Sequence, residues 1–348
     1  MTSEGDMTVT KPRLFTAEAD LPATLPAVVA LPAIEAAAAR IVGRVVRTPL
    51  VASPSLSRLC GKPIHLKLET RQPIGAFKLR GAMNAVLALT DDQRQRGLVT
   101  ASTGNHGRAV AYTARELDLA ATVCMSALVP ANKVEAIRSH GAEVRIVGRS
   151  QGEAQVEVER LVAERGLTQI PPFDDLDVVA GQGTIGLELI EDLPELACVL
   201  IPLSGGGLAA GIAVAVKALR PSARIIGISM ERGAAMAAAI RAGRPVEVIE
   251  EETLADSLGG GIGLANRVTF ALCHDLIDEV VLLNEAEIAA GIRHAALVEN
   301  EVVEGAGAVG IAALLAGKVS PQGPTAIIVS GRNIDEAVHR RIVSGASA

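Results

Sequence analysis

The sequence predicts an α/β protein of two domains, each a three-layer αβα arrangement around a mainly parallel sheet. The chain has 348 residues, which is enough for two domains. Short aliphatic runs alternate with stretches of helical periodicity, a pattern typical of parallel sheets covered by helices on both faces. Hydrophobic residues make up 49% of the chain but aromatic residues only 1%, so the core must be aliphatic.

The expected elements follow one another along most of the chain. The strands are predicted at residues 64–68, 98–101, 121–125, 143–146, 199–202, 224–229, 280–283 and 325–329. The helices are predicted at residues 81–89, 107–117, 132–140, 154–165, 183–192, 208–219, 285–300 and 308–315. A shift in composition at residues 171–172 is the best boundary between domains.

We therefore expect three parts. Residues 1–30 would form a flexible N-terminal arm, because this stretch is interrupted by prolines. Residues 31–96 together with 174–348 would form a large domain, and residues 97–173 a small one.

Composition also excludes several classes of partner. The net charge of −6, the absence of Trp and the single Tyr disfavour nucleic-acid binding. The four cysteines form no Cys-x-x-Cys pair, so we expect free thiols and a cytoplasmic protein. No apolar run free of proline and charge is long enough to span a membrane.

One lysine lies in a segment that suits covalent chemistry. Lys78 follows Gly75-Ala76-Phe77 and precedes Leu79-Arg80-Gly81. A lysine held at the floor of a closed site can form a Schiff base with an aldehyde cofactor. Taken alone, the segment would more often be an ordinary strand, turn and helix with a surface lysine.

Two loops suit anionic groups. Residues 102–107, Ser-Thr-Gly-Asn-His-Gly, precede a helix and could cradle a carboxylate or simply cap that helix. Residues 204–208, Ser-Gly-Gly-Gly-Leu, open another helix and could bind a phosphate. The second loop also fits the dinucleotide fingerprint, with Glu231 placed as a ribose-binding acid, so a nicotinamide-dependent oxidoreductase is an alternative.

Three further features complete the pattern. Ser330 follows the strand at 325–329, where α/β proteins bind ligands. Gly181-Gln182-Gly183-Thr184 is predicted to precede a helix, and Glu304-Gly305 to begin another. The histidines show no metal-ligand spacing, and Cys273-His274 is most simply a core pair.

Together these motifs resemble the pyridoxal-phosphate (PLP) enzymes of the tryptophan-synthase β fold, or fold type II. The lysine segment, the loop at 102–107, the Gly-Gln-Gly-Thr stretch, the glycine-rich loop and Ser330-Gly-x-Asn occur in the order of the serine/threonine dehydratase branch. The resemblance spans residues 34–342. Within the branch, residues 72–78 and 229–233 are most similar to the hydroxyectoine-utilisation dehydratases.

The resemblance implies a cofactor site and a substrate site. Lys78 would hold the cofactor and act as the catalytic base, and Thr103 stands where racemases carry a serine as second acid or base. The other expected PLP-binding residues are Phe77, Asn105, Ser204, Gly205, Gly206, Gly207, Leu208, Glu304 and Ser330. The expected substrate-binding residues are Ser102, Thr103, Asn105, His106, Glu153, Gly260 and Gly261.

The implied activity is the β-elimination of water from a β-hydroxy amino acid, with release of a 2-oxo acid and ammonia. A PLP-dependent racemase is the alternative on the same scaffold. Relatives bind a cation through two carboxylates, but Ser229 and Ala235 stand there in this chain, so we expect no metal. The acidic Glu153 favours a substrate with a second, cationic nitrogen, such as a ring-opened derivative of hydroxyectoine. A homodimer is also expected.

Overall fold

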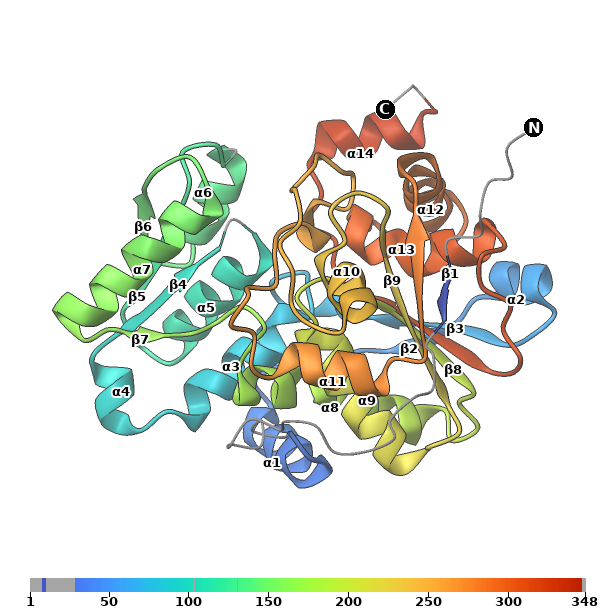
Figure 1. Cartoon of the computed structure of the whole chain (residues 1–348), viewed down its shortest axis with the longest axis horizontal. Helices are drawn as coiled ribbons and strands as arrows, with labels where there is room; N and C mark the ends of the chain where they lie inside the picture. Colours follow the sequence, from blue (N-terminus) through green and yellow to red (C-terminus); the bar gives the residue numbers. More distant parts are fainter. Residues whose placement is uncertain (1–7, 11–28, 103, 130, 346–348) are drawn as a thin grey trace.

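The computed structural model describes residues 8–10, 29–102, 104–129 and 131–345 (Figure 1). Two sheets organise them. The large sheet has seven strands in the order β1-β10-β9-β8-β11-β3-β2, and the small sheet has four in the order β6-β5-β4-β7. The smaller sheet with its helices lies to one side of the larger one (Figure 1).

The large sheet is parallel at its centre and antiparallel at both edges. The outer strands β1 and β2 run antiparallel to β10 and β3, and the other neighbours are parallel. The strands are β1 (Thr8–Thr10), β2 (Leu50–Ala52), β3 (Ile64–Leu68), β8 (Cys198–Pro202), β9 (Arg224–Met230), β10 (Glu279–Leu283) and β11 (Thr325–Val329).

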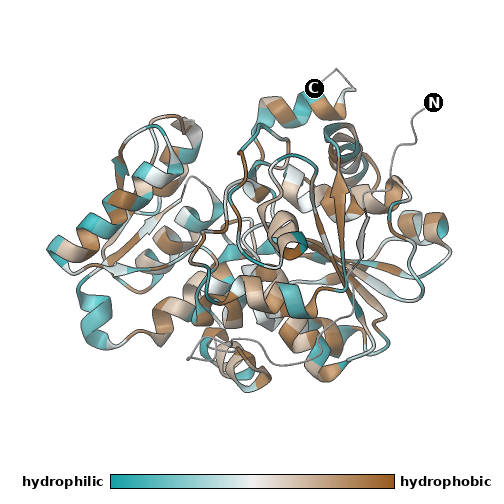
Figure 2. Cartoon of the chain, in the orientation of Figure 1, coloured by the Kyte–Doolittle hydropathy of each residue, from teal (hydrophilic) through white to brown (hydrophobic). Residues whose placement is uncertain are grey.

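Helices cover both faces of this sheet, and each face has its own aliphatic core. One core packs the sheet against α1 (Leu31–Ile41), α8 (Leu176–Asp192), α9 (Gly207–Leu219), α10 (Ala235–Ala242) and α11 (Thr269–Leu276). The other packs it against α2 (Pro54–Cys60), α12 (Glu285–Leu297), α13 (Gly305–Leu315) and α14 (Glu336–Val343). The strands between these layers are mostly hydrophobic, as expected for a buried parallel sheet (Figure 2).

The small sheet is parallel throughout. It contains β4 (Leu98–Ala101), β5 (Ala121–Met125), β6 (Glu143–Ile146) and β7 (Thr168–Gln169). Helices α5 (Asn105–Glu116) and α6 (Ala131–Arg138) share a core with α3 (Lys78–Ala88), and α7 (Gln151–Arg165) covers the opposite face. The short α4 (Asp91–Gln95) and the 3-10 turns η1 (Glu69–Arg71) and η2 (Asp256–Leu258) complete the described elements.

The predicted strands are all present, with ends shifted by at most one residue. Seven of the eight predicted helices begin earlier than expected, and the helix predicted at 285–300 begins at Glu285 but ends at Leu297. The α/β class with mostly parallel sheets is confirmed. Residues 8–10, within the predicted flexible arm, pair with β10, and the rest of the arm up to residue 28 lies outside the described residues. The edge strands β2 and β7 and the helices α1, α2, α4, α10, α11 and α14 were not predicted. All of them except α1 have at most eight residues, whereas α1 has eleven and was missed although it is amphipathic.

The Gly-Gln-Gly-Thr stretch was placed wrongly before a helix, since it lies inside α8. A Cβ at Gly181 would lie 2.6 Å from the Arg80 carbonyl oxygen, and one at Gly81 would lie 2.3 Å from the Gln182 side chain. A Cβ at Gly211 would lie 2.3 Å from the Val179 carbonyl oxygen. Glycines therefore let α3, α8 and α9 cross almost backbone to backbone, which fixes the start of α3 beside the sheet.

Candidate active site

The loop before α3 is tied by its backbone to the end of the central strand β11. Ala76 forms an antiparallel bridge with Gly331, and the Phe77 N–H donates to the Ser330 carbonyl oxygen over 3.0 Å. Gly75 supports this loop with a φ of 74°, a conformation that residues with a side chain rarely adopt. Lys78, the first residue of α3, is thereby placed beside Ser330.

The Lys78 amine is buried without a carboxylate partner among the described residues. Its Nζ donates to the Pro172 carbonyl oxygen over 2.6 Å and lies 5.3 Å from the centre of the Phe77 ring. Part of the lysine surface remains exposed, but burial of the ammonium lowers the pKa of Lys78 to about 8. An amine with this pKa is uncharged, and so nucleophilic, in a useful fraction of molecules near neutral pH.

The glycine-rich loop lies at the carboxyl end of β8 and opens α9. Gly206 is the N-cap of α9 with a φ of 91°, and no side chain caps this helix end. A Cβ at Gly205 would lie 2.4 Å from the Phe173 ring, so only glycine fits there. Uncapped backbone N–H groups at the start of a thirteen-residue helix suit a phosphate.

Residues 172–174 join these pieces, although the sequence indicated only a domain boundary nearby. Pro172 accepts from Lys78, Phe173 lies on the glycine-rich loop, and Asp174 accepts from the backbone N–H groups of residues 267–269 at the start of α11. A clue was present in the sequence, since Phe173 is one of only four phenylalanines. The Pro-Pro-Phe-Asp segment is therefore the floor of the site.

The loop before α5 brings Ser102, Asn105 and His106 together. Ser102 Oγ accepts from the Gly107 N–H over 2.9 Å, and His106 Nε2 lies 2.9 Å from the Ile170 carbonyl oxygen. Burial, reinforced by the charge of Lys78, lowers the pKa of His106 to about 3, so its ring is neutral. The predicted catalytic residue Thr103 lies outside the described residues.

Glu304, predicted only from the family resemblance, is a buried carboxyl group at the start of α13. Its Oε1 accepts from Asn105 Nδ2 over 2.7 Å. Burial is the main reason that the pKa of Glu304 is raised to about 7. A Cβ at Gly331 would lie 2.4 Å from Oε1, so glycine is needed where the loop after β11 passes this carboxyl group.

The remaining predicted substrate residues are less closely connected to this cluster. Gly260, with a φ of 93°, and Gly261 lie after η2, and a Cβ on Gly260 would meet nothing within 4 Å. Glu153 is exposed on the first turn of α7, where its carboxylate accepts from the Arg149 N–H over 2.7 Å and from Ser150 Oγ over 3.0 Å. Within the part of the chain described, no contact joins Glu153 to the other predicted site residues.

One ion pair beside the site joins a helix that packs on the small sheet to a 3-10 turn that packs against α13. Lys133 Nζ on α6 lies 2.7 Å from Asp256 Oδ2 on η2. Asp256 also lines a surface hollow of about 700 Å³ together with Glu250, Glu251 and Glu252. Gly259 and Arg232 also line this hollow, in which carboxylates outnumber cations.

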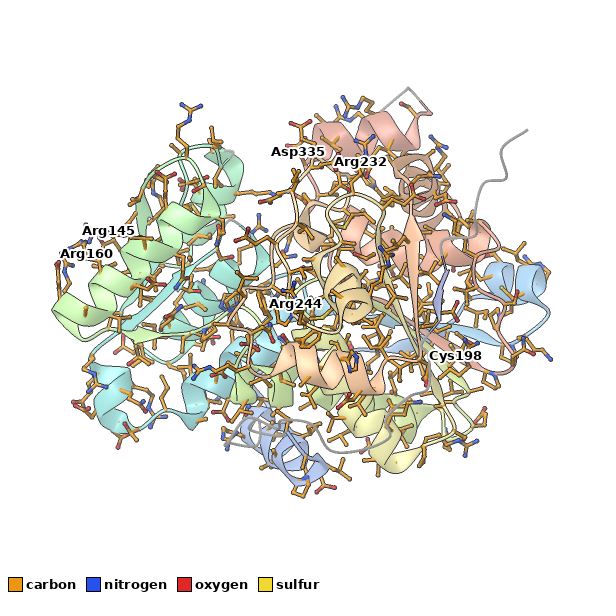
Figure 3. The ribbon with its side chains drawn as sticks, in the orientation of Figure 1. Arg145, Arg160, Cys198, Arg232, Arg244 and Asp335 are labelled. Atoms are coloured by element: carbon orange, nitrogen blue, oxygen red, sulfur yellow. The ribbon has the colours of Figure 1, made fainter. Side chains whose placement is uncertain are left out.

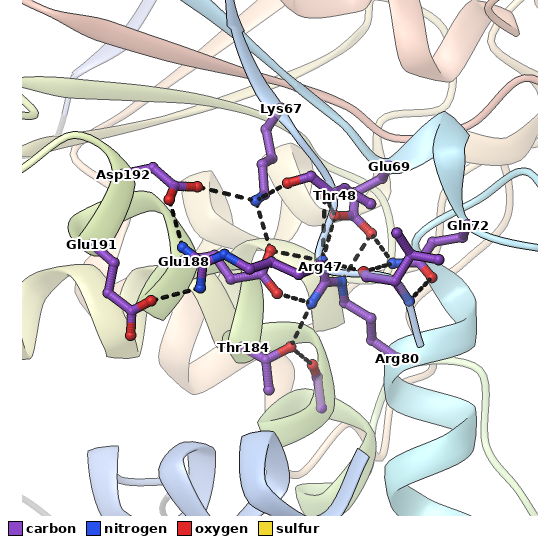
Figure 4. A network of polar contacts seen from close by, with 12 residues as sticks. Arg47, Thr48, Lys67, Glu69, Gln72, Arg80, Thr184, Glu188, Glu191 and Asp192 are labelled. Atoms are coloured by element: carbon purple, nitrogen blue, oxygen red, sulfur yellow. Dashed lines mark hydrogen bonds and ion pairs between the residues drawn. The ribbon is translucent and has the colours of Figure 1, made fainter. Parts of the chain in front are cut away.

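A buried ionic network holds Arg80, in the first turn of α3 and two residues after Lys78 (Figure 4). Arg80 donates through Nε and Nη2 to Glu69 over 2.9 and 2.8 Å, and through Nη1 to Glu188 over 2.6 Å. Lys67 Nζ lies 2.6 Å from Glu188 and 2.7 Å from the Thr48 carbonyl oxygen. The network joins β3, η1, α3 and α8, so it fixes the direction from which Lys78 enters the site.

The residues tied to competing interpretations have structural partners, and Cys273 packs beneath the glycine-rich loop. Glu231 lies 3.6 Å from Lys318, with which it forms an ion pair. His274 contacts Asp275, and the buried thiol of Cys273 donates to the Gly206 carbonyl oxygen over 3.6 Å. Among the described residues, no group of three or more His, Cys, Asp or Glu side chains could hold a metal ion. No helix in the described ranges is long and apolar enough to cross a membrane.

A buried lysine amine, an uncapped glycine-rich helix start and a strand-ending serine define an α/β enzyme site that suits a phosphate-bearing aldehyde. Residues 41–331 match the family described as pyridoxal-phosphate dependent enzyme, and the chain belongs to this family. It is a PLP-dependent enzyme of the threonine dehydratase type, and the residues present fit that cofactor. The nicotinamide alternative is thereby rejected.

Two relatives show how closely the chain follows its family. It is 60% identical over 316 residues to a Sinorhizobium fredii protein provisionally named threonine dehydratase, covering 90% of this chain and 95% of that one. It is 40% identical over 299 residues to the L-threonine ammonia-lyase of Thermotoga maritima, covering 86% and 74%.

Solved structures agree on the fold. Maize serine racemase superposes with a TM-score of 0.86 at 33% identity, covering 92% of this chain and 98% of the racemase. The T.th. threonine deaminase superposes with a TM-score of 0.82 at 36% identity, covering 88% and 99%.

Proposed function

We propose that the protein removes water from a β-hydroxy amino acid to give an enamine, which water then hydrolyses to a 2-oxo acid and ammonia. The observation that carries the proposal is the Lys78 amine, which is buried, has a lowered pKa and contacts no carboxylate among the described residues. The names of relatives as threonine dehydratase and threonine ammonia-lyase support it. L-threonine and L-serine are therefore the reference substrates.

The proposed roles follow from the chemistry of each group. Bound PLP would supply an electron sink for the negative charge that develops at the substrate α-carbon. Lys78 would hold the cofactor and take the α-proton, because its amine is available near neutral pH. Ser330 would face the ring nitrogen, and a neutral hydroxyl does not force protonation of that nitrogen as a carboxylate would.

The other roles concern binding. Ser204, Gly205, Gly206, Gly207 and Leu208 would hold the phosphate at the start of α9, and Phe77 would pack on the ring. Glu304 and Asn105 would face the oxygen substituent of the ring. The residues proposed for the substrate are Ser102, Thr103, Asn105, His106, Glu153, Gly260 and Gly261.

A narrower substrate class is also proposed. An open-chain, hydroxylated diaminobutyrate-like acid, of the kind formed when the ring of hydroxyectoine is opened, carries a free α-amine, a β-hydroxyl and a second cationic nitrogen. The acidic hollow formed by Glu250, Glu251, Glu252 and Asp256 supports a cationic substrate, because a cleft of one charge sign attracts ligands of the opposite sign. A ring nitrogen at the α-carbon could not react with the cofactor, so a hydrolase must act first.

The test is a substrate panel scored for 2-oxo acid. We expect turnover of L-threonine and L-serine, and a higher kcat/KM for the hydroxylated diamino acid that falls in Glu153→Gln. Glutamine keeps an acceptor oxygen for the α7 cap, so the variant changes charge with little loss of shape. Preference for threonine that Glu153→Gln leaves unaltered would reject the narrower class, and D-serine without oxo acid would favour a racemase.

Metal dependence gives a second test. Ser229 and Ala235 provide no carboxylate where relatives bind a cation, and divalent cations usually require carboxylate ligands. Activity should therefore be unchanged by EDTA. A loss with EDTA that magnesium reverses would show that other groups hold a cation.

A further inference from the structure

Asn105 is held by a chain of polar groups that ends one turn further along α5. Asn105 Nδ2 donates to Glu304 Oε1 over 2.7 Å, and Asn105 Oδ1 accepts from Asn333 Nδ2 over 2.6 Å. Arg108 Nη1 in turn donates to Asn333 Oδ1 over 2.8 Å. Segments that are far apart in the sequence are thus linked directly at the site.

The donors and acceptors in this chain fix its direction. A guanidinium group carries only donors, so the Asn333 amide must turn its oxygen toward Arg108. The Ile74 carbonyl oxygen only accepts, and it receives Asn333 Nδ2 over 2.9 Å. The Asn333 nitrogen is then also directed at Asn105 Oδ1, which leaves the Asn105 nitrogen facing Glu304 and the interior of the site.

Arg108 is attracted by the charge of Glu304, but without a direct contact between the two side chains. It is partly buried, burial lowers the pKa of Arg108, and it forms no ion pair with a carboxylate among the described residues. Its guanidinium donates to a neutral amide, although a carboxylate would repay the burial of its charge better. Asn105 is only 8% exposed, so its amide cannot be oriented by bulk water.

We propose that Arg108 is a positioning residue, which acts through Asn333 to hold the Asn105 amide with its nitrogen toward the bound ligand. Asn105 then presents a hydrogen-bond donor to an anionic oxygen, the group that a PLP ring carries beside its aldehyde. Without Arg108, only the Ile74 carbonyl oxygen would hold the Asn333 amide in this direction. The two amides would then turn over in a larger fraction of molecules and direct the Asn105 oxygen at that anion. The inference rests on the proposed PLP site and deepens it by naming what sets its polarity.

The first experiment compares Arg108→Met with Arg108→Lys. Apoprotein is titrated with PLP, and the dissociation constant and the pH midpoint of the visible absorption band are measured without substrate. Loss of one hydrogen bond to a charged group predicts an approximately tenfold weaker PLP affinity and a shifted pH midpoint in Arg108→Met. Arg108→Lys keeps a donor-only group and should restore both values.

Arg115→Met is the matched control, because Arg115 lies on the same helix but contacts Glu116 and His140 at the surface. It should behave as wild type. Unchanged affinity and pH midpoint in Arg108→Met would overturn the proposal. Absence of any visible band in the wild type would instead contradict the PLP site itself, which keeps the two failures distinct.

A double-mutant cycle tests whether Arg108 acts through Asn333. In an Asn333→Ala background, Arg108→Met should cause no further change in PLP affinity, whereas additive effects would contradict the proposed path. Asn333→Asp provides a test that does not depend on the folding of Arg108→Met. A carboxylate only accepts, so Asn105 must turn its nitrogen toward it, and PLP should bind more weakly; wild-type affinity would overturn the proposal.

Discussion

Lys78 and Arg80 lie two residues apart at the start of α3, and both carry a cation into the interior, but their surroundings are opposite. Arg80 is 1% exposed and contacts two carboxylates, those of Glu69 and Glu188. Lys78 contacts a carbonyl oxygen and, within the described residues, no carboxylate. Burial therefore lowers the pKa of Lys78, whereas at Arg80 the two carboxylates outweigh burial and raise the pKa.

The difference separates a structural cation from a reactive one. A buried charge that is paired with an opposite, hydrogen-bonded charge stays ionised and fixes the helices and strands that carry the pair relative to each other. A buried amine without a counter-charge is ready to lose its proton, which is the property a nucleophile or base requires. The same turn of helix thus holds the reactive group and the group that fixes its position.

The largest effect is expected from Lys78→Ala. Turnover should fall by at least about a thousandfold, because the variant loses both the covalent attachment and the base. Circular dichroism should remain that of a folded protein, since a buried amine without a counter-charge adds little stability. The exposed Lys62→Ala serves as control, and near-normal turnover in Lys78→Ala would remove Lys78 from the mechanism.

Arg80→Met should show the reverse pattern, with stability affected first. Removing the guanidinium leaves the buried Glu69 and Glu188 with much less compensation, and breaking a buried pair of this kind costs about 3–5 kcal/mol. The measurement is the free energy of unfolding in urea. Adding Glu69→Gln should recover part of the loss, and failure to recover any would show that the charges are not what Arg80 stabilises.

The sequence allowed the strands and the lysine motif to be predicted, because both depend on local pattern. Aliphatic runs marked the central strands, and the order of glycine-rich loops identified the cofactor family. The roles of Pro172 and Phe173 could not be predicted, since they arise only when α3 and α9 pack beside them. The link from Arg108 through Asn333 to Asn105 likewise spans distant segments.

The helix starts were misplaced for a related physical reason. Glycines such as Gly181 and Gly183 indicate a loop when only local conformational preference is considered. In the folded chain they lie inside α8, where a Cβ at Gly183 would come within 2.6 Å of Ile34. Tertiary packing therefore decided the structure of these segments against their local preference.

A pH series of the apoprotein examines Lys78 by itself. The folded pKa of Lys78, about 8, lies below the ordinary value of 10.5, so the native state releases this proton more readily than the unfolded state. Relative to Lys78→Met, the wild type should gain stability, by about 1 kcal/mol or more, as the pH rises from 8 toward 10.5. This contribution is absent once the pH has fallen below 8. The measurement is the free energy of unfolding in urea of both proteins at each pH. A difference between the two proteins that stays the same from pH 8 to 10.5 would contradict the lowered pKa.

The smallest effect is expected where a cation meets carboxylates at the surface. Arg160 on α7 pairs with Glu157 over 2.8 Å and with Glu164, and Arg145 approaches Glu157 over 3.3 Å, at the outer edge of the small sheet (Figure 3). Water and salt screen such pairs, and fixing long side chains costs entropy. Arg160→Gln should therefore leave the urea midpoint unchanged at physiological salt, although Arg160, like Arg80, contacts two carboxylates. A loss comparable to that of Arg80→Met would show that the number of partners, rather than burial, determines how strongly a cation holds this fold.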